Sequence, residues 1–530
     1  MQIKKYKVAT LLFLFFTGLT LMSCQHQYPK NITGIAFEKS PLVNSQVRLL
    51  DAKGKTLHGL TDAQDRYFFS LHNITAPLLI SVSTGPASDC VVNSRLRPIC
   101  MSVLVDQFSK ESIQIANINP LTDRLVSDVS VMKGFIGPQQ WINSNSVGDI
   151  QQDWIDQSRL FLKRGFGDAF VSAKLTDGKN FNPATYSADQ HDIAASVFSL
   201  IHHNRNYDNN SGETGHTTLA DISFRPIVGL FPSGEYEPLN FFRAHDEFNK
   251  IKKAKLRIFI VGDSTSAVYE QLRFPRMGWG QAFAEKFLNR DDVVIVVGSR
   301  AGRSSRDFYN GRWFAQMEPL IQPGDYLLIN HGHNDQNCDA LKPIRGAADV
   351  MNLCTYPNDD LGQPQFPLEK PEMSFQHSLE NYLQLARKKS AIPILFTPTT
   401  RIKNAVGLQN VPVVTSHYTR KSDEKHYRYV GDYSKTIREV AIKNQVPLID
   451  LETASIQFVN SLQDSDWKDY WLVVDENHYP FYANGMQGSR QLPDGTHFQK
   501  KGAEVMAELV SQLILQNSEL AKLSEKLFNQ

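Results

Sequence analysis

The sequence predicts a multidomain protein whose C-terminal half is an α/β domain, with a parallel five-stranded sheet between helices. From residue 255 onward, short apolar and β-branched runs alternate with segments of helical spacing, which is the pattern of buried parallel strands joined by helices. The strand-like runs are KLRIFIV, DVVIVVG, DYLLINH, AIPILFT and VPLIDL. Before residue 255 the pattern differs, and a chain of 530 residues is long enough for two or three domains.

The first residues of the chain have the pattern of an export signal. Lysines at positions 4, 5 and 7 precede an apolar stretch over residues 8–21, which is short for a membrane span. The stretch ends in LMSC, which resembles a bacterial lipobox. The resemblance implies that residues 1–23 are cleaved, that Cys24 carries lipid, and that Gln25 directs the lipoprotein to the outer membrane of a Gram-negative cell, facing the periplasm or the cell surface. An ordinary signal peptide with a chance cysteine is the alternative.

Residues 24–30 are expected to be a tether, and residues 31–101 a small β-sandwich. The runs ITGIAF, SQVRLLDAKGKTL, DRYFFSL and PLLISVS are alternating or β-rich and are separated by turn residues. The stretch PLVNSQVRLLDAKGKTLHGLTDAQDRYFFSL resembles carboxypeptidase-regulatory-like and transthyretin-like modules. Such a module would be structural or adhesive.

Residues 102–216 are expected to be a polar helical region, and residues 217–254 a linker. Apolar residues recur at helical spacing in DIQQDWIDQSRLFLKRGFGDAFV and in ADQHDIAASVFSLIHHNRN. His202 and His203 could suggest a metal site, but a surface-facing pair at a helix end is the preferred interpretation. No chemistry is expected in this region.

Composition and cysteine spacing narrow the function classes. The 56 basic and 55 acidic residues nearly balance, which argues against a nucleic-acid-binding protein. Besides Cys24, the cysteines form two close pairs, Cys90 with Cys100 and Cys338 with Cys354. An exported chain meets an oxidising compartment, so two local disulfides are expected, with four free thiols as the alternative. The spacing fits no familiar zinc motif.

A candidate nucleophile follows the first strand of the α/β domain. The run RIFIVGDS ends at Ser264, at the carboxyl end of a strand, where open α/β sheets place their sites. A serine hydroxyl needs a base and oxyanion donors. The segment PDGTHF supplies Asp494 and His497, three residues apart, and a turn or first helical turn would place both on one side. Alone, this pair is weak evidence for a catalytic site, because many helix N-termini carry an Asp cap and a nearby His.

Two more blocks lie at strand ends. The run DYLLINH leads into GHND, whose Asn334 could donate its side-chain amide to an oxyanion. The run DVVIVVG leads into AGRS, where Gly302 would let its backbone N–H approach a substrate closely. His333 is expected to be a packing residue, although the histidines of this loop also suggest a metal site.

In this order, the blocks resemble a known family. VGDSTSAV, GWGQ, AGRSSRDF, HGHND and DGTHF are similar to the motifs of SGNH (GDSL-type) hydrolases, and most to the rhamnogalacturonan acetylesterase branch, over about residues 255–519. The resemblance implies a flavodoxin-like SGNH hydrolase domain over residues 255–520. It implies no metal and no cofactor.

The resemblance also implies a role for each site residue. Ser264 would be the nucleophile, His497 the base and then the acid, and Asp494 the group that orients the histidine. The oxyanion hole would consist of the Ser264 N–H, the Gly302 N–H and the Asn334 side-chain amide.

The chain departs from the compact family pattern in long stretches at about residues 336–373, 406–431 and 461–491. The last is rich in aromatic residues, which could form a carbohydrate platform or a small core that orders the insertion. These residues are Trp467, Tyr470, Trp471, Tyr479, Phe481 and Tyr482. Arg303 and Arg306 could bind an acidic polysaccharide or form ordinary ion pairs.

The expected function is therefore that of an exported carbohydrate O-acetylesterase. It would remove acetyl groups from a polysaccharide or oligosaccharide such as pectin or rhamnogalacturonan through an acetyl-Ser264 intermediate. Its partners would be this substrate and, through Cys24, a membrane. One alternative is a lipid or short-acyl esterase of the same superfamily, which would need an apolar acyl groove. Another is a surface-anchored carbohydrate-binding protein with an inactive hydrolase domain, against which the intact motif residues argue.

Overall fold

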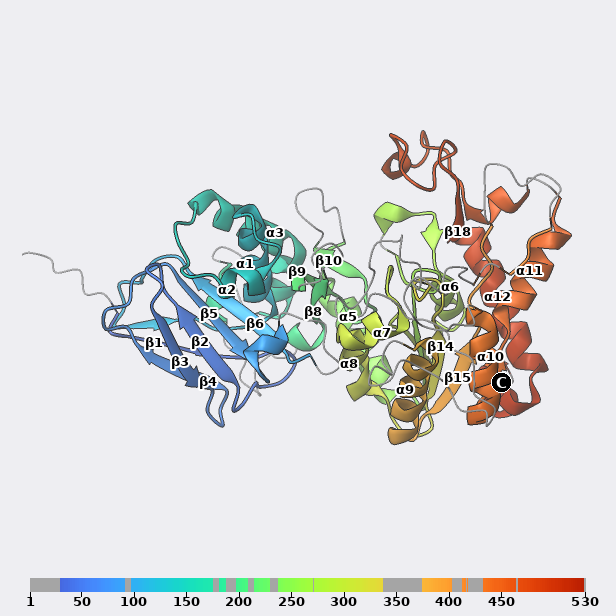
Figure 1. The fold of residues 1–530 in the computed structure, drawn as a ribbon, viewed down its shortest axis with the longest axis horizontal. Coiled ribbons are helices and arrows are strands. Elements are labelled where there is room, and N and C mark those ends of the chain that lie inside the picture. Colours follow the sequence, from blue (N-terminus) through green and yellow to red (C-terminus); the bar gives the residue numbers. More distant parts are fainter. Residues whose placement is uncertain are drawn as a thin grey trace, which may run out of the picture.

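The structure is a computed structural model that describes residues 29–90, 97–174, 181–186, 197–207, 214–228, 237–269, 271–336, 374–402, 412–415, 417, 432–463 and 466–528. The described chain is elongated, with the N-terminal strands at one end and the C-terminal helices at the other (Figure 1). Among these residues, no helix has the length and apolar character needed to cross a membrane. The expected lipidation site, Cys24, and the expected Cys338–Cys354 disulfide lie outside the described residues and stay predictions.

The N-terminal part is a β-sandwich of two sheets with strand orders β4-β1-β7 and β3-β2-β5-β6. Their strands are β1 (Asn31–Ile35), β2 (Gln46–Leu50), β3 (Thr56–Leu60), β4 (Arg66–Ser70), β5 (Leu78–Ser83), β6 (Cys100–Val105) and β7 (Ile113–Ile115). Alternate residues such as Ile32, Leu49 and Ile80 meet in one core between the sheets. The predicted boundary at residue 101 is wrong, because β6 continues to Val105 and β7 pairs with β1. All six residues of β6 are buried, so its sequence lacks the alternation of a half-exposed strand.

The middle part mixes helices with a small sheet. Its helices are α1 (Pro120–Met132), α2 (Pro138–Ile142) and α3 (Gln152–Ser172), and its antiparallel strands are β8 (His202–Tyr207), β9 (Thr214–Ala220) and β10 (Pro226–Val228). The helical prediction holds for α3 but is wrong for the end of the region. The predicted linker over residues 217–254 instead contains most of β9, all of β10, and α5 (Phe241–Lys253).

The interpretation of His202 and His203 as a surface pair is also wrong. Both lie on β8 and are buried, with 0% and 4% of their surface exposed. This polar strand can be buried because its side chains form ion pairs and hydrogen bonds with a buried carboxylate. The carboxylate of Asp123 on α1 lies 2.9 Å from His203 Nε2 and 2.5 Å from Arg205 Nη2. Burial raises the pKa of Asp123, but the Arg205 charge and the His203 hydrogen bond outweigh it and hold the pKa well below its usual range.

The C-terminal part contains the predicted five-stranded sheet, with strand order β13-β11-β14-β15-β16 and parallel pairing throughout. These strands are β11 (Leu256–Gly262), β13 (Val293–Val297), β14 (Tyr326–Asn330), β15 (Ile392–Phe396) and β16 (Leu448–Ile449). Its helices are α6 (Trp279–Glu285), α7 (Ser305–Asn310), α8 (Trp313–Met317), α9 (Phe375–Lys388), α10 (Tyr433–Asn444), α11 (Leu451–Ser461), α12 (Lys500–Gln516) and α13 (Ala521–Phe528). The fold class is confirmed.

Two hydrophobic cores cover the two faces of this sheet. On one face, residues such as Ile258 and Ile260 of β11 pack with α6, α11, α12 and α13. On the other face, Phe259 and Val261 pack with α5 and α7 to α10. The second core continues without a break into the middle part, where it includes α1, α3 and the strands β9 and β10 (Figure 1). The middle part and the five-stranded sheet therefore share one core.

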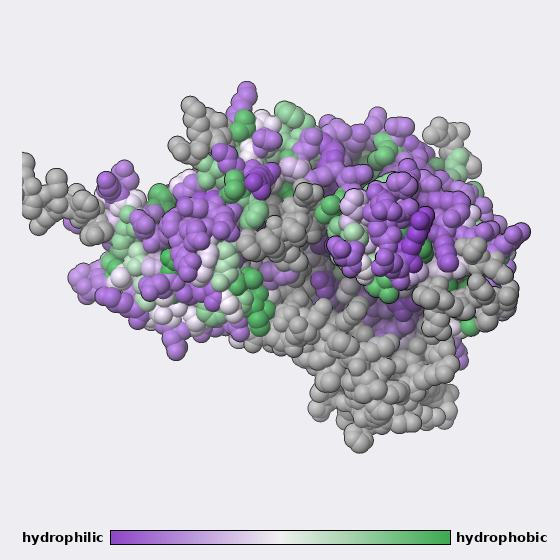
Figure 2. Space-filling model, turned by 90° about the horizontal axis from the view of Figure 1, so that it is seen from above, coloured by the Kyte–Doolittle hydropathy of each residue, from purple (hydrophilic) through white to green (hydrophobic). Residues whose placement is uncertain are grey.

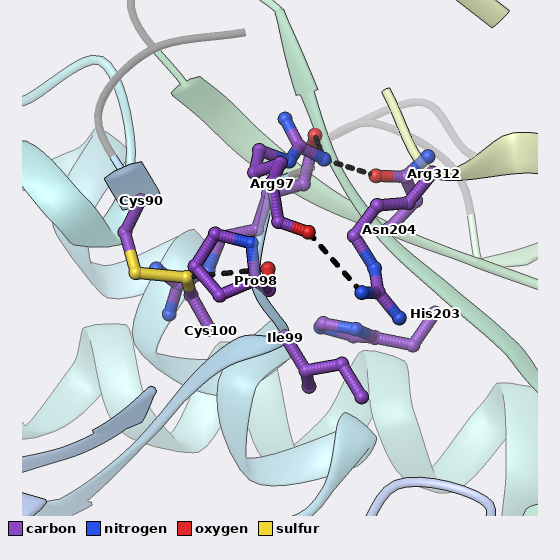
Figure 3. A pocket seen from close by; sticks show the side chains of 9 residues that line it. Cys90, Arg97, Pro98, Ile99, Cys100, His203, Asn204 and Arg312 are labelled. Carbon is purple, nitrogen blue, oxygen red and sulfur yellow. Dashed lines mark hydrogen bonds between the residues drawn. A yellow bond between two sulfur atoms is a disulfide. The ribbon is translucent and has the colours of Figure 1, made fainter. Parts of the chain in front are cut away.

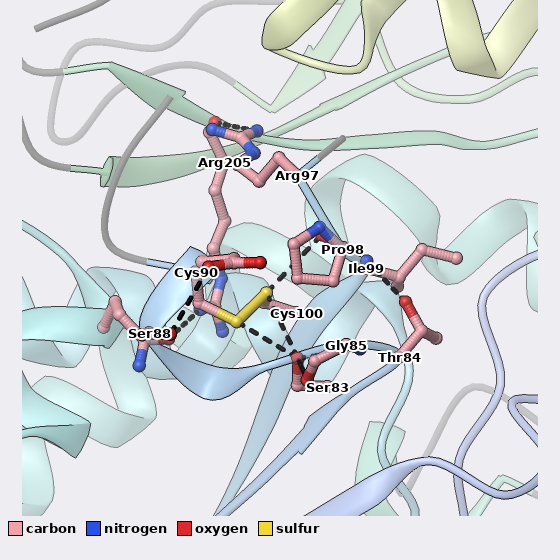
Figure 4. Close-up of a disulfide and its surroundings, with 12 residues drawn as sticks. Ser83, Thr84, Gly85, Ser88, Cys90, Arg97, Pro98, Ile99, Cys100 and Arg205 are labelled. Atoms are coloured by element: carbon pink, nitrogen blue, oxygen red, sulfur yellow. Dashed lines mark hydrogen bonds between the residues drawn. A yellow bond between two sulfur atoms is a disulfide. The ribbon is translucent and has the colours of Figure 1, made fainter. Parts of the chain in front are cut away.

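A polar junction joins the N-terminal half to the C-terminal part beside this core. Cys90 and Cys100 form the predicted disulfide at the edge of the sandwich (Figure 4). Arg97, just before β6, is buried, and its Nη2 lies 2.5 Å from Asn204 Oδ1, 2.6 Å from the Arg205 carbonyl oxygen and 3.2 Å from that of Gly311 (Figure 3). Gly311 ends α7, so Arg97 ties β8 to the C-terminal part.

Candidate active site

The turn that carries Ser264 is held by its own backbone and by its neighbours. Ser264 lies just beyond the fully buried strand β11 and is 7% exposed. The Asp263 carboxylate accepts hydrogen bonds from the Thr265 N–H and hydroxyl at 3.0 and 2.9 Å, and from the His333 N–H at 3.3 Å. A Cβ on Gly262 would lie 2.5 Å from the Asn330 carbonyl oxygen, so only glycine fits there. Asp263 therefore fixes the turn and links it to the loop after β14.

The GWGQ block packs against the same turn. The Trp279 N–H donates to the Thr265 carbonyl oxygen at 2.9 Å, and its indole N–H donates to Asn330 Oδ1 at 3.0 Å. Cβ atoms on Gly278 and Gly280 would lie within 2.3 and 2.4 Å of backbone oxygens of the turn. Both glycines are thus needed for the close approach of α6 to the turn.

Ser264, His497 and Asp494 come together as a hydrogen-bonded chain. Ser264 Oγ lies 2.8 Å from His497 Nε2, and His497 Nδ1 lies 2.6 Å from Asp494 Oδ2. Asp494 and His497 lie not on a helical turn but on β18 (Asp494–Gln499), directly before α12. The Asp494 Oδ1 atom accepts the backbone N–H groups of Thr496 and His497 at 2.8 and 3.2 Å, which bends the strand so that both side chains share one side.

The strand β18 is anchored close to the serine turn. It lies between β12 (Arg276–Met277) and β17 (Trp471–Leu472) in a small antiparallel sheet. Because β12 precedes α6, this pairing brings the histidine to the serine across a separation of 233 residues.

The protonation states suit a general base. Burial raises the pKa of Asp494, but the His497 hydrogen bond and charge outweigh it, so that the pKa falls to about 2. Burial and the charge of Arg276 lower the pKa of His497, and Asp494 only partly offsets them. At neutral pH the histidine is therefore neutral. With Asp494 ionised, Nδ1 donates to the carboxylate and Nε2 is free to accept the serine proton.

Gly302 and Asn334 follow the two strands that flank β11. Since β13 and β14 lie on either side of β11, the loops after these three strands meet at one edge of the sheet. Gly302 has φ +75°, and a Cβ on it would meet no atom within 4 Å, so its backbone borders open space. Asp335 accepts the Ser305 N–H and hydroxyl at 2.8 and 2.6 Å. This bond ties the Asn334 loop to the start of α7, just after Gly302.

The sequence model of the GDSL-like Lipase/Acylhydrolase family matches residues 260–505, which include all of these groups. This part of the chain is a GDSL-like hydrolase domain. Rhamnogalacturonan acetylesterase RhgT of Bacillus subtilis (strain 168) is 29% identical over 263 residues, which is 49% of this chain and 90% of that protein. The probable rhamnogalacturonan acetylesterase YesY of the same organism is 26% identical over 256 residues, or 48% and 90% of the two chains. The protein is accordingly a carboxylic ester hydrolase.

Solved structures resemble the same half of the chain. An acetylxylan esterase from Geobacillus stearothermophilus, Axe2, has 13% sequence identity and a TM-score of 0.29, with 49% of this chain and 95% of that chain covered. A lipase/acylhydrolase from Enterococcus faecalis has 15% identity and a TM-score of 0.27, with 48% and 94% covered.

The structure adds His417, Glu452 and Arg401 to the residues of the GDSL-like hydrolase domain that the sequence singled out. Behind the Asn334 loop, His333 Nδ1 lies 3.2 Å from His417 Nε2, and His417 Nδ1 lies 2.7 Å from Glu452 Oε1. Arg401 donates to the His333 carbonyl oxygen at 2.8 Å. Burial lowers the pKa of His333 well below its usual range. His417 lies in one of the long insertions and Glu452 follows a short strand, so no local motif marks either.

No metal site accompanies these histidines in the part of the chain that the structure describes, where no three His, Cys, Asp or Glu side chains are grouped to hold an ion. Arg303 forms an ion pair with Asp307 at 3.0 Å, as the ordinary interpretation expected, and Arg306 is buried.

The aromatic insertion forms a small core. Trp471 and Tyr482 are fully buried, and Tyr479 and Phe481 pack against the cluster of Leu472, Val474 and Tyr482. Trp467 is buried in the core beneath the sheet. The structure therefore favours the core interpretation over an exposed carbohydrate platform for the buried rings.

Arg276 is a positive charge close enough to His497 to lower the pKa of the histidine. Its Nη2 donates to the Tyr269 hydroxyl at 3.0 Å, and its guanidinium lies over the Tyr269 ring, 4.5 Å from the centroid. The Tyr269 hydroxyl in turn donates to the Ser264 carbonyl oxygen at 2.7 Å. Among the described residues, no carboxylate lies within ion-pair distance of Arg276, and its Nε has no hydrogen-bond partner.

Proposed function

We propose that this protein is a carbohydrate O-acetylesterase that releases acetate from a polysaccharide such as rhamnogalacturonan or pectin through an acetyl-Ser264 intermediate. The observation that carries the proposal is the Ser264–His497–Asp494 chain, with distances of 2.8 and 2.6 Å. Two rhamnogalacturonan acetylesterases, one of them named as probable, match this domain over 90% of their own length, which supports the acetylated substrate.

In the proposed reaction, His497 Nε2 takes the proton of Ser264 as its Oγ attacks the acetyl carbonyl carbon. The oxyanion of the tetrahedral intermediate accepts hydrogen bonds from the Ser264 N–H, the Gly302 N–H and the Asn334 amide. The histidine then gives its proton to the sugar oxygen, which leaves. Water, deprotonated by His497, attacks the acetyl-Ser264 ester, and acetate is released.

Arg276 supports a substrate that contains uronic acids. A guanidinium pairs well with a carboxylate, and this one has no carboxylate partner in the described chain. A uronate next to the acetylated sugar would supply that partner. A lipid substrate would instead need an apolar acyl groove, whereas Arg276, Asn334 and Arg401 make the surroundings of Ser264 polar. Figure 2 views the molecule from above the orientation of Figure 1, and hydrophilic residues predominate among the coloured residues of that face.

Acetate release tests this proposal directly. The wild-type protein should release acetate from acetylated rhamnogalacturonan faster than from acetylated xylan, and should hydrolyse 4-nitrophenyl acetate faster than long-chain 4-nitrophenyl esters. Ser264→Ala should abolish both activities, whereas Ser461→Ala, an exposed serine on α11, should leave them unchanged. Mass spectrometry of a rapidly quenched reaction should find one acetyl group on the peptide that contains Ser264. A preference for long acyl chains would support the lipid-esterase alternative instead.

We also propose that the chain is an exported lipoprotein anchored through Cys24. The basis is the LMSC sequence behind a positively charged and apolar segment. Metabolic labelling with a fatty acid should mark the wild-type protein and not Cys24→Ser. A mature protein that begins elsewhere and carries no acyl group would contradict this proposal.

A further inference from the structure

A cavity of about 270 Å³ lies in the N-terminal half of the molecule, outside the GDSL-like hydrolase domain. Its walls come from the end of β6, the loop to β7, the helices α1 and α3, and the short 3-10 helix Pro183–Thr185. Sites for small ligands begin at roughly 300 Å³, so the space suits a single ring-sized group.

Two of the elements that line the cavity carry polar atoms that lack hydrogen-bond partners. The Arg159 Nε and Ser109 Oγ atoms are both shielded from solvent, and neither has a hydrogen-bond partner among the described residues. The Ser109 backbone is held in place, because its N–H donates to Gln114 Oε1 at 2.8 Å. Buried polar atoms in native proteins are nearly always hydrogen-bonded, so two such atoms among the residues that line one cavity point to a ligand that supplies the partners.

The other lining residues define the chemistry of that ligand. Asp106 faces the same cavity, and its carboxylate lies 3.8 Å from Arg159 Nη2, at the outer limit of an ion pair. Arg159 Nη1 also lies 3.8 Å from the Asp156 carboxylate, so two carboxylates already offset the charge of Arg159, and the cavity favours a neutral ligand over an anionic one. Leu104, Leu125 and Pro183 supply an apolar surface on the same cavity.

We propose that this cavity binds a neutral sugar unit of a glycan. Sugar hydroxyl groups both donate and accept hydrogen bonds. They can therefore accept hydrogen bonds from Arg159 and Ser109 and donate hydrogen bonds to the Asp106 carboxylate. The apolar face of a pyranose ring packs against the apolar surface. A uronic acid is disfavoured because its carboxylate would lie next to Asp106. The site is separate from Ser264, and the inference does not depend on which ester the hydrolase domain cleaves.

Binding is measured on the full chain with Ser264→Ala, so that no substrate is consumed. Isothermal titration calorimetry uses neutral galacto-, arabino-, xylo- and gluco-oligosaccharides, with oligogalacturonate as the acidic comparison. At least one neutral oligosaccharide should bind, and Arg159→Gln should weaken its Kd by at least about tenfold, since a hydrogen bond from a charged donor is lost. Gln107→Trp, which places a large ring at the exposed edge of the cavity, should abolish the binding. Gln64→Trp, an exposed position in the turn between β3 and β4, is the matched control and should bind normally.

The two substitutions must change glycan binding without changing stability or esterase activity. In the otherwise wild-type chain, Arg159→Gln and Gln107→Trp should keep their melting temperature and their kcat/KM for 4-nitrophenyl acetate, because neither residue lies near Ser264. The proposal is overturned if no neutral oligosaccharide binds, or if binding persists in Gln107→Trp. It is also overturned if oligogalacturonate binds in a manner that Arg159→Gln abolishes, because the cavity would then be an anion site.

Discussion

Replacing Asp494 with asparagine separates the electrostatic role of this side chain from its structural role. Asparagine has the same shape, and its Oδ1 atom can still accept the backbone N–H groups of Thr496 and His497. Its amide nitrogen would replace the carboxylate oxygen that lies 2.6 Å from His497 Nδ1. An amide nitrogen donates, so Nδ1 must accept, and the imidazole proton moves to Nε2. In that tautomer the nitrogen that faces Ser264 cannot take the serine proton.

The expected magnitude follows from the burial of this pair. Asp494 is 2% exposed, so water cannot replace the lost carboxylate. The equivalent exchange in a serine protease, with the wrong tautomer as its result, lowers kcat about 10⁴-fold. We expect a loss of roughly 10³–10⁴ in kcat here, which is about 4–5.5 kcal/mol of transition-state stabilisation.

The same substitution has a smaller cost in stability. The pKa of Asp494 is about 2 in the folded protein against 3.8 ordinarily. A depressed carboxyl pKa adds stability that is present above the unfolded pKa and is lost as the pH falls through the folded pKa. At neutral pH this amounts to roughly 2 kcal/mol, and Asp494→Asn should lose about that much. The melting temperature should therefore fall modestly while activity nearly vanishes.

The assay is the pH dependence of kcat/KM for 4-nitrophenyl acetate, with thermal unfolding in parallel. Asp466→Asn, an exposed aspartate in the segment before β17, is the matched control and should change neither quantity. Activity of Asp494→Asn within tenfold of wild type would refute the reasoning, because it would mean that the carboxylate does not set the tautomer.

Three further predictions concern the surroundings of this pair. Arg276→Gln removes a charge that lowers the pKa of His497, so the acid limb of the kcat/KM profile should move to higher pH; an unmoved limb would contradict the assignment. Asn334→Ala should lower kcat by roughly 10²–10³ with no change in melting temperature, as expected for loss of one oxyanion donor, and a change in KM alone would argue against that role. Arg97→Ala should destabilise the protein by roughly 3–6 kcal/mol, from two charge-assisted hydrogen bonds, while exposed Arg66→Ala should not; equal melting temperatures would show that the junction contributes nothing.

The sheet of the hydrolase domain could be predicted because its strands are buried on both faces. β11 has seven buried residues in a row, and such an apolar run between turn residues has few other interpretations. The run HHNRNY at β8 shows the opposite case. It is polar, yet His203 and Arg205 are buried, because Asp123 and Glu38 from distant segments pair with these two side chains. A local pattern contains no information about such partners.

The site residues likewise divide into those that a local sequence motif reveals and those that only the fold brings to the site. Ser264 and Asn334 stand in short motifs at strand ends, which the sequence alone locates. The bend that places Asp494 beside His497 depends on side-chain to backbone hydrogen bonds. The three-residue spacing predicted that the two side chains share one side, but on a turn or a first helical turn and not on the strand β18. His417 reaches the site only through the folding of a long insertion, so no spacing could have indicated it.

Phe224 shows what the shared core means for the evolution and the handling of this enzyme. Its ring stacks on His202 at 3.9 Å, and its carbonyl oxygen accepts a hydrogen bond from Arg300 of the hydrolase domain at 2.7 Å. A recombinant fragment that begins at residue 255 would expose Trp313 and Met317, which pack in the same core, to water. Such a fragment should aggregate unless those positions are redesigned. The N-terminal half and the hydrolase domain of this chain should therefore fold as one unit, and a hydrolase domain transferred to another protein would need a matching apolar surface there.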